Sequence, residues 1–219
     1  MSENSFKDAV LIYGASGHCK VIIDAVIKEG KYRIVGILDD DPKLWKGEFC
    51  GYPVIGGENV LKDKAYRDTR LILAIGENAA RKKLWQTINA LGYELACPVH
   101  PSAQIGRNVS IGVGSVIMAN TAINSGTRIG ENAIINTGAT VDHDCVLEDY
   151  VHISPGAHLA GDVYVGELTH IGIGASVIQG VKIGRNVIIG AGAVVIDDIP
   201  NNVTAVGVPA TVIKHHEKV

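Results

Sequence analysis

The feature that most constrains the fold of this sequence is an aliphatic residue at every sixth position of its C-terminal half, from Val99 to Val195 without a slip. Two positions before most of these residues stands a small or compact residue, and glycine or a small polar residue commonly follows. An α-helix would need apolar residues at a spacing near 3.6, and a strand meander would not keep one period through its turns. A fixed six-residue period predicts a β-helix.

Each six-residue unit is expected to form one short strand with its aliphatic and small side chains inward, then a corner suited to glycine, asparagine or aspartate. Three units close one triangular coil, so neighbouring coils lie roughly 4.8 Å apart. The repeat accounts for about five to six coils. After Val195 the sequence leaves this frame. We expect the last segment to cap strand edges that would otherwise stay unpaired.

Residues 1–97 follow another pattern, in which expected strands and helices alternate. The expected strands are 9–14, 32–40 and 70–76, and the expected helices are 20–30 and 78–92. This alternation predicts an α/β domain with a small parallel, Rossmann-like sheet covered by helices. From residue 98 to residue 219 we expect an all-β left-handed parallel β-helix with a C-terminal cap.

Composition excludes several classes of protein. The formal charge of −3 comes from 20 basic and 23 acidic residues, interspersed along the chain, so no nucleic-acid surface is expected. No apolar run approaches the roughly 20 residues of a membrane helix, and the polar start of the chain does not suggest a secretory signal. The four cysteines are widely spaced and form no CxxC pair, so we expect them to be free thiols. We expect a cytoplasmic protein without membrane insertion.

His143 is the strongest candidate for a catalytic group. It takes the third place of its six-residue unit, at an expected corner, between Asp142 and Asp144. An imidazole there is exposed, and a neighbouring carboxylate can fix its tautomer and favour its protonated form. Such a group can act as a general base, although a solvated corner histidine without a catalytic role is the simpler alternative.

Three further histidines are expected to point outward from the middle of strands. His152 and His170 are one coil apart and should stack on one face, whereas His158 falls on another. Ile134 and Ile188 extend the column of His152 and His170. An exposed apolar column of this kind is typical of a subunit interface. The alternative is that these histidines only pack there.

Six ordered motifs carry a resemblance to a known family. They are YGASGH at 13–18, LDD at 38–40, AIGEN at 74–78, INTGATVDHDC at 135–145, HISPGAHLAG at 152–161 and VGVPA at 206–210. Together they resemble the hexapeptide-repeat acyltransferases along the whole chain. The closer resemblance is to sugar N-acetyltransferases of the bacillosamine pathway and to similar sialic-acid O-acetyltransferases, which have a small α/β domain before the β-helix.

The resemblance implies roles for residues of the β-helix. It makes His143 the catalytic base and Asp144 its orienting acid, with Asp142 as the other possibility. It places His152 near the acetyl group of acetyl-CoA. The positions that match the coenzyme groove of the family are Gly161, Ile173 and Ala191, although a glycine would match better at the last of these.

The loop from Gly14 to His18 connects an expected strand to an expected helix. Its glycines allow a tight turn, and backbone N–H groups at the start of a helix can face an anion. A full GxGxxG motif is absent, so a dinucleotide site is not indicated, and a plain turn is the alternative. The resemblance assigns this part of the chain to the nucleotide of a sugar-nucleotide substrate. The residues so assigned are Gly14, Ser16, Gly17, His18, Asp39, Asp40 and Gly76.

The geometry of a β-helix separates the two sets of candidates. His143 lies on the corner opposite the face of His152, so we expect them on the order of 10 Å or more apart in one chain. If both serve one site, as the resemblance implies, the site must form between subunits. This argues for a homotrimer with three clefts.

The leading hypothesis is transfer of acetyl from acetyl-CoA to the amino group of a nucleotide-linked amino sugar, specifically a UDP-4-amino-4,6-dideoxy sugar. No metal is expected. O-acetylation of sialic acid or another sugar is the alternative that needs the same base and fold. A zinc hydratase built on a β-helix and a non-catalytic sugar-nucleotide-binding scaffold are the alternatives from other classes, although the histidine spacing does not match the hydratase pattern.

Overall fold

The computed structural model describes residues 8–217. The polar N-terminal segment, in which no secretory signal is expected, lies almost wholly outside them. The chain divides into two compact units between Pro101 and Ser102.

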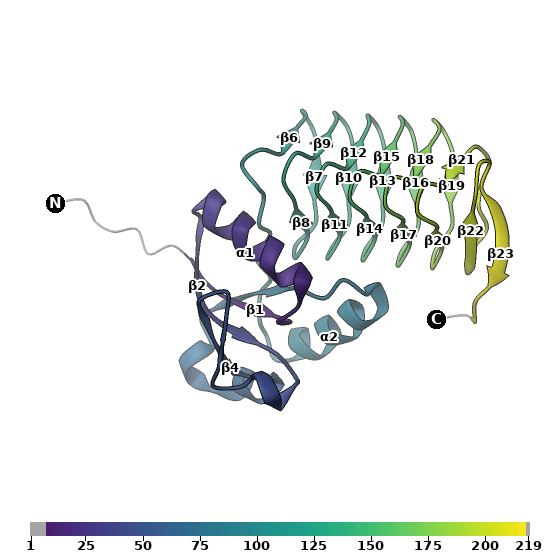
Figure 1. Cartoon of the computed structure of the whole chain (residues 1–219). Coiled ribbons are helices and arrows are strands. Elements are labelled where there is room, and N and C mark those ends of the chain that lie inside the picture. The colour runs from purple at the N-terminus through teal and green to yellow at the C-terminus, as the bar shows by residue number, and fades with distance from the viewer. Residues whose placement is uncertain (1–7, 218–219) are drawn as a thin grey trace. The chain divides into compact units, whose positions relative to one another are not determined.

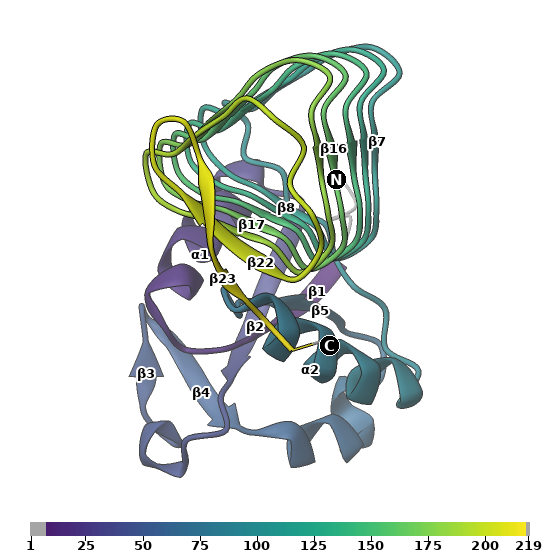
Figure 2. The ribbon, with the colours of Figure 1, turned by 90° about the vertical axis from the view of Figure 1, so that its right-hand side faces the viewer.

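The N-terminal unit is built on a five-stranded sheet of order β3-β4-β2-β1-β5 (Figures 1 and 2). Its strands are β1 (Asp8–Tyr13), β2 (Tyr32–Leu38), β3 (Glu48–Phe49), β4 (Tyr52–Gly56) and β5 (Arg70–Leu73), and its helices are α1 (Gly17–Glu29) and α2 (Asn78–Ala90). Strand β1 is an interior strand of the sheet, since it pairs in parallel with both β2 and β5. This position accounts for the complete burial of Val10, Leu11 and Ile12. The three predicted strands and two predicted helices are confirmed.

The predicted parallel sheet has one further feature at its edge, where β3 and β4 form an antiparallel hairpin. Its two turn residues, Cys50 and Gly51, have φ of 51° and 80°. Two left-handed residues are what a tight two-residue hairpin requires, and asparagine or aspartate usually fills the first position. With cysteine there, and only two residues in β3, the sequence carried no clear hairpin signal.

The C-terminal unit is a parallel β-helix of two-residue strands that pair one coil apart, as the six-residue period predicted. For example, Ile135 pairs with Ile153 and Ile153 pairs with Ile171. Sheet I contains β6 (Gln104–Ile105), β9 (Ala122–Ile123), β12 (Thr140–Val141), β15 (His158–Leu159), β18 (Ser176–Val177) and β21 (Val194–Val195). Sheet II contains β7 (Ser110–Ile111), β10 (Arg128–Ile129), β13 (Val146–Leu147), β16 (Tyr164–Val165) and β19 (Lys182–Ile183). Sheet III contains β8 (Val116–Ile117), β11 (Ile134–Ile135), β14 (His152–Ile153), β17 (His170–Ile171), β20 (Ile188–Ile189), β22 (Val203–Val206) and β23 (Thr211–His215). Viewed along the axis, the coils form nested triangular outlines (Figure 2).

The corners turn through one left-handed residue, three positions after each aliphatic residue of the repeat from Ile105 to Ile189. Glycine, asparagine or aspartate fills nearly all of these places, which confirms the predicted corner chemistry. The exceptions are Tyr150 and Leu168, with φ of 57° and 63°. A left-handed conformation costs such residues about 1–2 kcal/mol each. Both side chains are buried, so the apolar area that they remove from water offsets this cost.

The interior of the β-helix is aliphatic, with a few buried hydroxyl groups. The Oγ1 atoms of Thr127 and Thr169 donate to the carbonyl oxygens of Asp142 and Gly184, both at 2.7 Å. A buried hydroxyl without such an acceptor would cost free energy, so these bonds explain why threonine is tolerated inside. They also connect these two coils to the coils that follow them.

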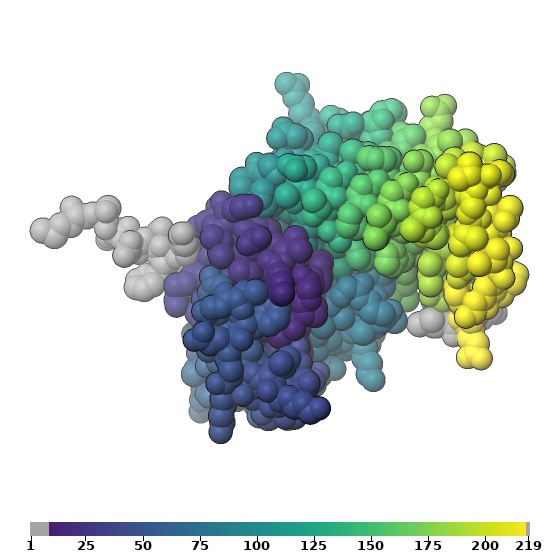
Figure 3. Space-filling view, viewed as in Figure 1, coloured from purple at the N-terminus to yellow at the C-terminus, as the bar shows by residue number. Residues whose placement is uncertain are grey.

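The segment after Val195 caps the end of the β-helix, as predicted. Strand β22 pairs in parallel with β20, and β23 folds back on β22. The backbone N–H of Ile199 donates to Lys182 O, which supplies a partner to the last strand of sheet II. Val194 N donates to Gly207 O, which does the same for sheet I. In the space-filling view the coils follow one another in chain order from teal to this yellow cap (Figure 3).

Candidate active site

The corner between β12 and β13 presents the imidazole of His143. Asp144 follows it with φ of 60°, so this aspartate is the left-handed residue that turns the corner. Its carboxylate Oδ2 lies 2.9 Å from Nδ1 of His143. The side chains of His143 and Asp144 are 61% and 68% exposed. The structure therefore places an exposed histidine–carboxylate pair where the sequence predicted it.

The other neighbouring acid, Asp142, has a different task. Its Oδ1 accepts hydrogen bonds from Asn124 Nδ2 at 2.7 Å and from the backbone N–H of His143 at 2.8 Å. These two bonds hold the pKa of Asp142 below its usual value. The sequence left open which of the two acids orients His143. Asp144 contacts the imidazole ring, whereas Asp142 accepts a hydrogen bond from the backbone N–H of His143.

The contact with Asp144 has two consequences for His143. Its hydrogen bond is the largest of the causes that raise the pKa of His143 above the usual value. Because Asp144 engages Nδ1, that nitrogen carries the proton in the neutral imidazole and Nε2 keeps its lone pair. Nε2 can therefore accept a proton from a nucleophile at the corner.

Replacing Asp144 with asparagine is expected to move the acidic limb of the pH–activity profile to lower pH. A raised pKa means that His143 is protonated, and so inactive as a base, as pH falls through that value. Removing the carboxylate lowers the pKa toward its usual value and also weakens the hold on the tautomer. The profile of kcat/KM against pH checks both the shift and a lower plateau at high pH. An unchanged limb would show that Asp144 does not tune the base.

The face of sheet III carries the second group of predicted residues. His152 and His170 pair in register and their rings stack with centroids 4.5 Å apart, as predicted. Asn136 Nδ2 lies 3.1 Å from His152 Nε2, and Ser154 Oγ lies 2.7 Å from His170 Nε2. The sequence offered no role for Asn136; its only signal was a polar residue directly after an inward isoleucine.

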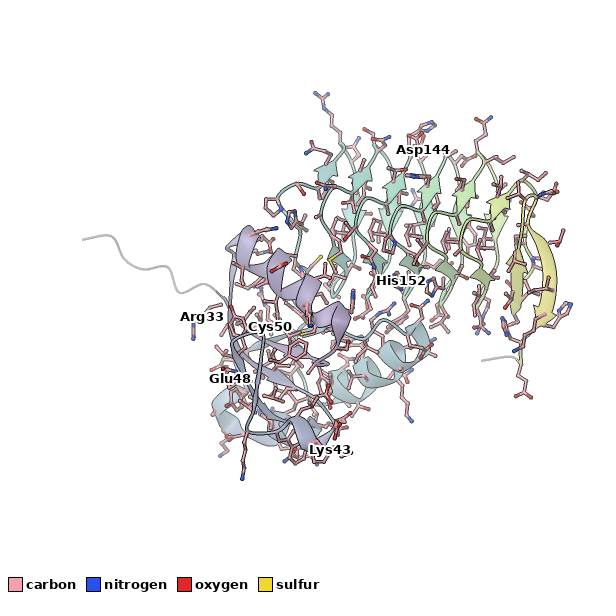
Figure 4. All side chains as sticks on the ribbon, viewed as in Figure 1. Arg33, Lys43, Glu48, Cys50, Asp144 and His152 are labelled. Atoms are coloured by element: carbon pink, nitrogen blue, oxygen red, sulfur yellow. The ribbon has the colours of Figure 1, made fainter. Side chains whose placement is uncertain are left out.

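The outward column of sheet III is less exposed than predicted. Ile134 and His152 are 1% and 9% exposed, and only Ile188 at 45% presents a large apolar surface. The predicted continuous exposed stripe is thus reduced to one end. Asp144, which is next to His143 in the chain, and His152 lie on opposite sides of the coils (Figure 4).

The three predicted groove positions do not lie together in one chain. Gly161 follows β15, on the corner of His143 and one coil further along, where Asp162 N donates to His143 O at 2.9 Å. Ile173 and Ala191 follow β17 and β20, on the corner between sheets III and I. Ile173 is 62% exposed, so this second corner is open to a ligand.

In the N-terminal unit, the predicted substrate residues occupy three loops. The first, second and third loops follow the carboxyl ends of β1, β2 and β5, respectively. These strands are neighbours in the sheet, and the chain leaves β1 toward β2 on one side and returns to β5 on the other. In open α/β sheets, ligands bind at the carboxyl ends of the strands, at the place where the chain leaves to opposite sides in this way. Gly14 has φ of 108°, and a Cβ there would lie 2.9 Å from Ala74 O, so only glycine fits where the first and third loops meet.

The two predicted acids of the second loop are already engaged. Asp39 accepts from Ala15 N at 2.7 Å and from Asp41 N at 2.9 Å, one bond on each carboxylate oxygen. Asp40 Oδ1 accepts from the hydroxyl of Tyr13 at 2.6 Å. Asp39 therefore joins the first loop to the second, and Asp40, which is exposed, is the better placed of the two to meet a ligand.

A buried arginine that the sequence did not single out organises the third loop. Arg81 of α2 is 1% exposed, and its guanidinium donates to Ile75 O and to Asn78 Oδ1, each at 2.9 Å. Burial and then the charge of Arg81 lower the pKa of His18 to about 4. His18 is therefore neutral at physiological pH at the start of α1.

Replacing Arg81 with methionine is expected to lower the free energy of unfolding by about 2 kcal/mol, because buried acceptors lose their charged donor. It should also raise KM for the sugar nucleotide, since Ile75 and Gly76 lose their anchor. Denaturant unfolding and steady-state kinetics check the two effects. Lys83→Met, on the exposed face of the same helix, is the matched control. Equal stability of the two variants would contradict this role.

Within residues 8–217, no three histidine, cysteine, aspartate or glutamate side chains lie close enough to hold a metal ion. In the same part of the chain, no helix is long and apolar enough to cross a membrane.

Comparison with protein families divides the chain as the fold does. The PglD N-terminal domain matches residues 9–88. The bacterial transferase hexapeptide (six repeats) matches 126–161 and 162–197, and the hexapeptide repeat of succinyl-transferase matches 103–143. Among curated proteins, UDP-N-acetylbacillosamine N-acetyltransferase of Bacillus subtilis (strain 168) is 40% identical over 113 residues. That match spans about half of either protein, 50% of this chain and 51% of the relative.

Solved structures extend the similarity to nearly the whole chain. A histidine-to-asparagine variant of perosamine N-acetyltransferase from Caulobacter crescentus, in complex with CoA and GDP-perosamine, is 42% identical with a TM-score of 0.89. The match covers 94% of this chain and 97% of that one. The acetyltransferase domain of PglB from Neisseria gonorrhoeae FA1090, also solved with acetyl coenzyme A, is 38% identical with a TM-score of 0.87, over 94% and 99% of the two chains. The chain therefore belongs to the PglD-type family of hexapeptide-repeat sugar N-acetyltransferases, which use acetyl-CoA.

Proposed function

We propose that this protein transfers acetyl from acetyl-CoA to the amino group of a nucleotide-linked amino sugar, with His143 as the general base. The observation that carries the proposal is the exposed His143–Asp144 pair, 2.9 Å apart, in a chain of this family. A base is needed because the amine loses a proton when its nitrogen attacks the thioester carbonyl.

Nε2 of His143 accepts the amine proton as the new C–N bond forms and returns it to the CoA sulfur as the C–S bond breaks. Asp144 stabilises the imidazolium that exists between these steps. Backbone N–H groups at the coil corners can stabilise the negative charge that develops on the carbonyl oxygen. The balance is one amide and one free thiol for each acetyl-CoA.

The nucleotide part of the acceptor is assigned to the three loops of the N-terminal unit. Exposed Ser16 and Gly17 begin α1, where backbone N–H groups favour a diphosphate. Asp40 and the open backbone at Gly76 suit hydrogen bonds to ribose or to a base. We propose a UDP-4-amino-4,6-dideoxy sugar as the acceptor. Relatives act on UDP-linked and GDP-linked amino sugars, so the acceptor panel must include both nucleotides.

The proposal includes a homotrimer with active sites between subunits. His143 and the groove residues His152, Ile173 and Ala191 lie on different sides of one coil stack, so one chain cannot bring them to one acetyl group. A neighbouring chain that faces the His143 corner with its sheet III completes the site, and cyclic closure gives three such clefts. The absence of disulfides among the four cysteines agrees with a cytoplasmic enzyme.

The test is acetyl-CoA-dependent thiol release with a panel of UDP- and GDP-linked 4-amino sugars, each paired with the 4-hydroxy sugar, and with sialic acid. The proposal expects stoichiometric thiol release and an amide product by mass spectrometry with an amino sugar. Acetyl esters formed on sialic acid or on the hydroxy sugars would support O-acetylation instead. Binding of the nucleotide sugars without any thiol release would support the non-catalytic sugar-nucleotide-binding scaffold instead.

A further inference from the structure

Gly161 differs from every equivalent residue of the β-helix. It takes the third place of its six-residue unit, the same place as His143, and each of the other third places from Arg107 to Ala191 carries a side chain. The corner does not need glycine for its turn, because the left-handed residue is the next one, Asp162 with φ of 58°. Something other than the backbone conformation therefore accounts for a glycine at position 161.

The space around Gly161 supplies that reason. A Cβ at this position would lie 2.6 Å from both Cε1 and Nε2 of His143 and 3.1 Å from its Cδ2. These are the three nearest atoms, and all belong to the imidazole. Glycines one place earlier in their units differ in this respect. A Cβ on Gly166 or Gly172 would instead meet backbone atoms of the next coil.

Asp144, the hydrogen-bond partner of the His143 imidazole, also lies close to a glycine of a neighbouring coil. A Cβ on Gly126, in the preceding coil, would lie 2.5 Å from Oδ1 of Asp144. The His143–Asp144 pair thus lies between two glycines, one in each flanking coil. Gly126, with φ of 80°, is itself the left-handed residue of its corner, so a substitution there would also strain the backbone, and the position that can be tested cleanly is Gly161.

We infer that Gly161 is a positioning residue for the general base, because its missing side chain is the space in which the imidazole of His143 lies while Nδ1 contacts Asp144. This inference rests on the proposed function for its kinetic consequence only. A methyl group at position 161 would overlap the Nε2 edge of the ring. The ring would then have to swing away from the coil, and the contact between Nδ1 and Asp144 would break.

The test uses the full-length Gly161→Ala variant and an NMR titration of the His143 ring, assigned by comparison with His143→Ala. We expect the pKa of His143 to fall toward its usual value, because the Asp144 contact raises it in the native protein. Gln179→Ala, on the same corner one coil further along, should leave the titration unchanged. A titration of His143 in Gly161→Ala that matches the native protein would overturn the inference. This readout needs no activity, so it stands apart from a failure of the proposed function.

Kinetics then separate positioning of the base from contact with the coenzyme. Gly161→Ala should lower kcat at least about ten-fold, with KM for acetyl-CoA unchanged, and should have no further effect in a His143→Ala background. A rise in KM for acetyl-CoA with kcat unchanged, or the same loss in both backgrounds, would show that Gly161 acts on the coenzyme and would also overturn the inference.

Discussion

Replacing His143 with alanine is expected to lower kcat about 10²–10⁴-fold, the usual contribution of a general base. KM for both substrates should change little, because the ring takes part in proton transfer and the proposed groove and nucleotide loops stay intact. The fold should not suffer, since the side chain is 61% exposed and its removal opens no cavity. Single-turnover formation of the amide, followed by mass spectrometry, measures the chemical step directly.

The matched control is His158→Ala. His158 is also exposed on the β-helix and its Nδ1 lies 2.9 Å from Thr140 Oγ1, but no carboxylate among residues 8–217 pairs with it. We expect near-native turnover from this variant. A His143→Ala enzyme that keeps near-native turnover would remove the proposed base from the mechanism, whatever His158→Ala does.

Replacing Ile188 with glutamate is expected to abolish both assembly and turnover. Ile188 is the exposed end of the outward column of sheet III, next to His170 in register. A side chain of this size contributes about 1.5–3 kcal/mol when its apolar surface is buried, and a buried carboxylate without a partner adds a further penalty. In a cyclic trimer this cost recurs at each interface. Light scattering and thiol release measure the two losses.

Lys182→Glu is the control for the added charge. Lys182 is exposed on sheet II and does not belong to the outward column of sheet III, so this variant should stay assembled and active. An Ile188→Glu protein that keeps the native mass and native turnover would show that sheet III does not form the contact between subunits.

The β-helix could be predicted almost residue by residue, because the six-residue period alone determines where its strands and corners lie and which strands pair. The aliphatic frame fixed which residues pair one coil apart, and that register placed His143 on a corner and stacked His152 on His170. The frame could not show which side chains the neighbouring coils leave room for. Gly161 was therefore expected from the family resemblance to contact coenzyme, while its contact with the His143 ring appears only in three dimensions.

The N-terminal unit was less predictable, because its order depends on contacts between loops distant in sequence. Asp39 and Asp40 were expected to face a ligand, yet both carboxylate oxygens of Asp39 accept hydrogen bonds from backbone N–H groups of two loops. Arg81 carries no motif, and its importance follows only from its burial against the loop after β5. The β3–β4 hairpin was missed because cysteine takes the place of the usual turn residue at position 50.

Mixed trimers test most directly whether one active site uses two chains. His143→Ala loses the base, and Ala191→Trp is expected to be inactive because its ring fills the coenzyme groove. If each cleft pairs His143 of one chain with the groove of its neighbour, subunit exchange at equal amounts should restore about a quarter of native thiol release. If each chain builds its own site, every chain in the mixture carries one defect and no activity returns. We expect turnover to be restored, and persistent inactivity after proven subunit exchange would show that each chain builds its own active site.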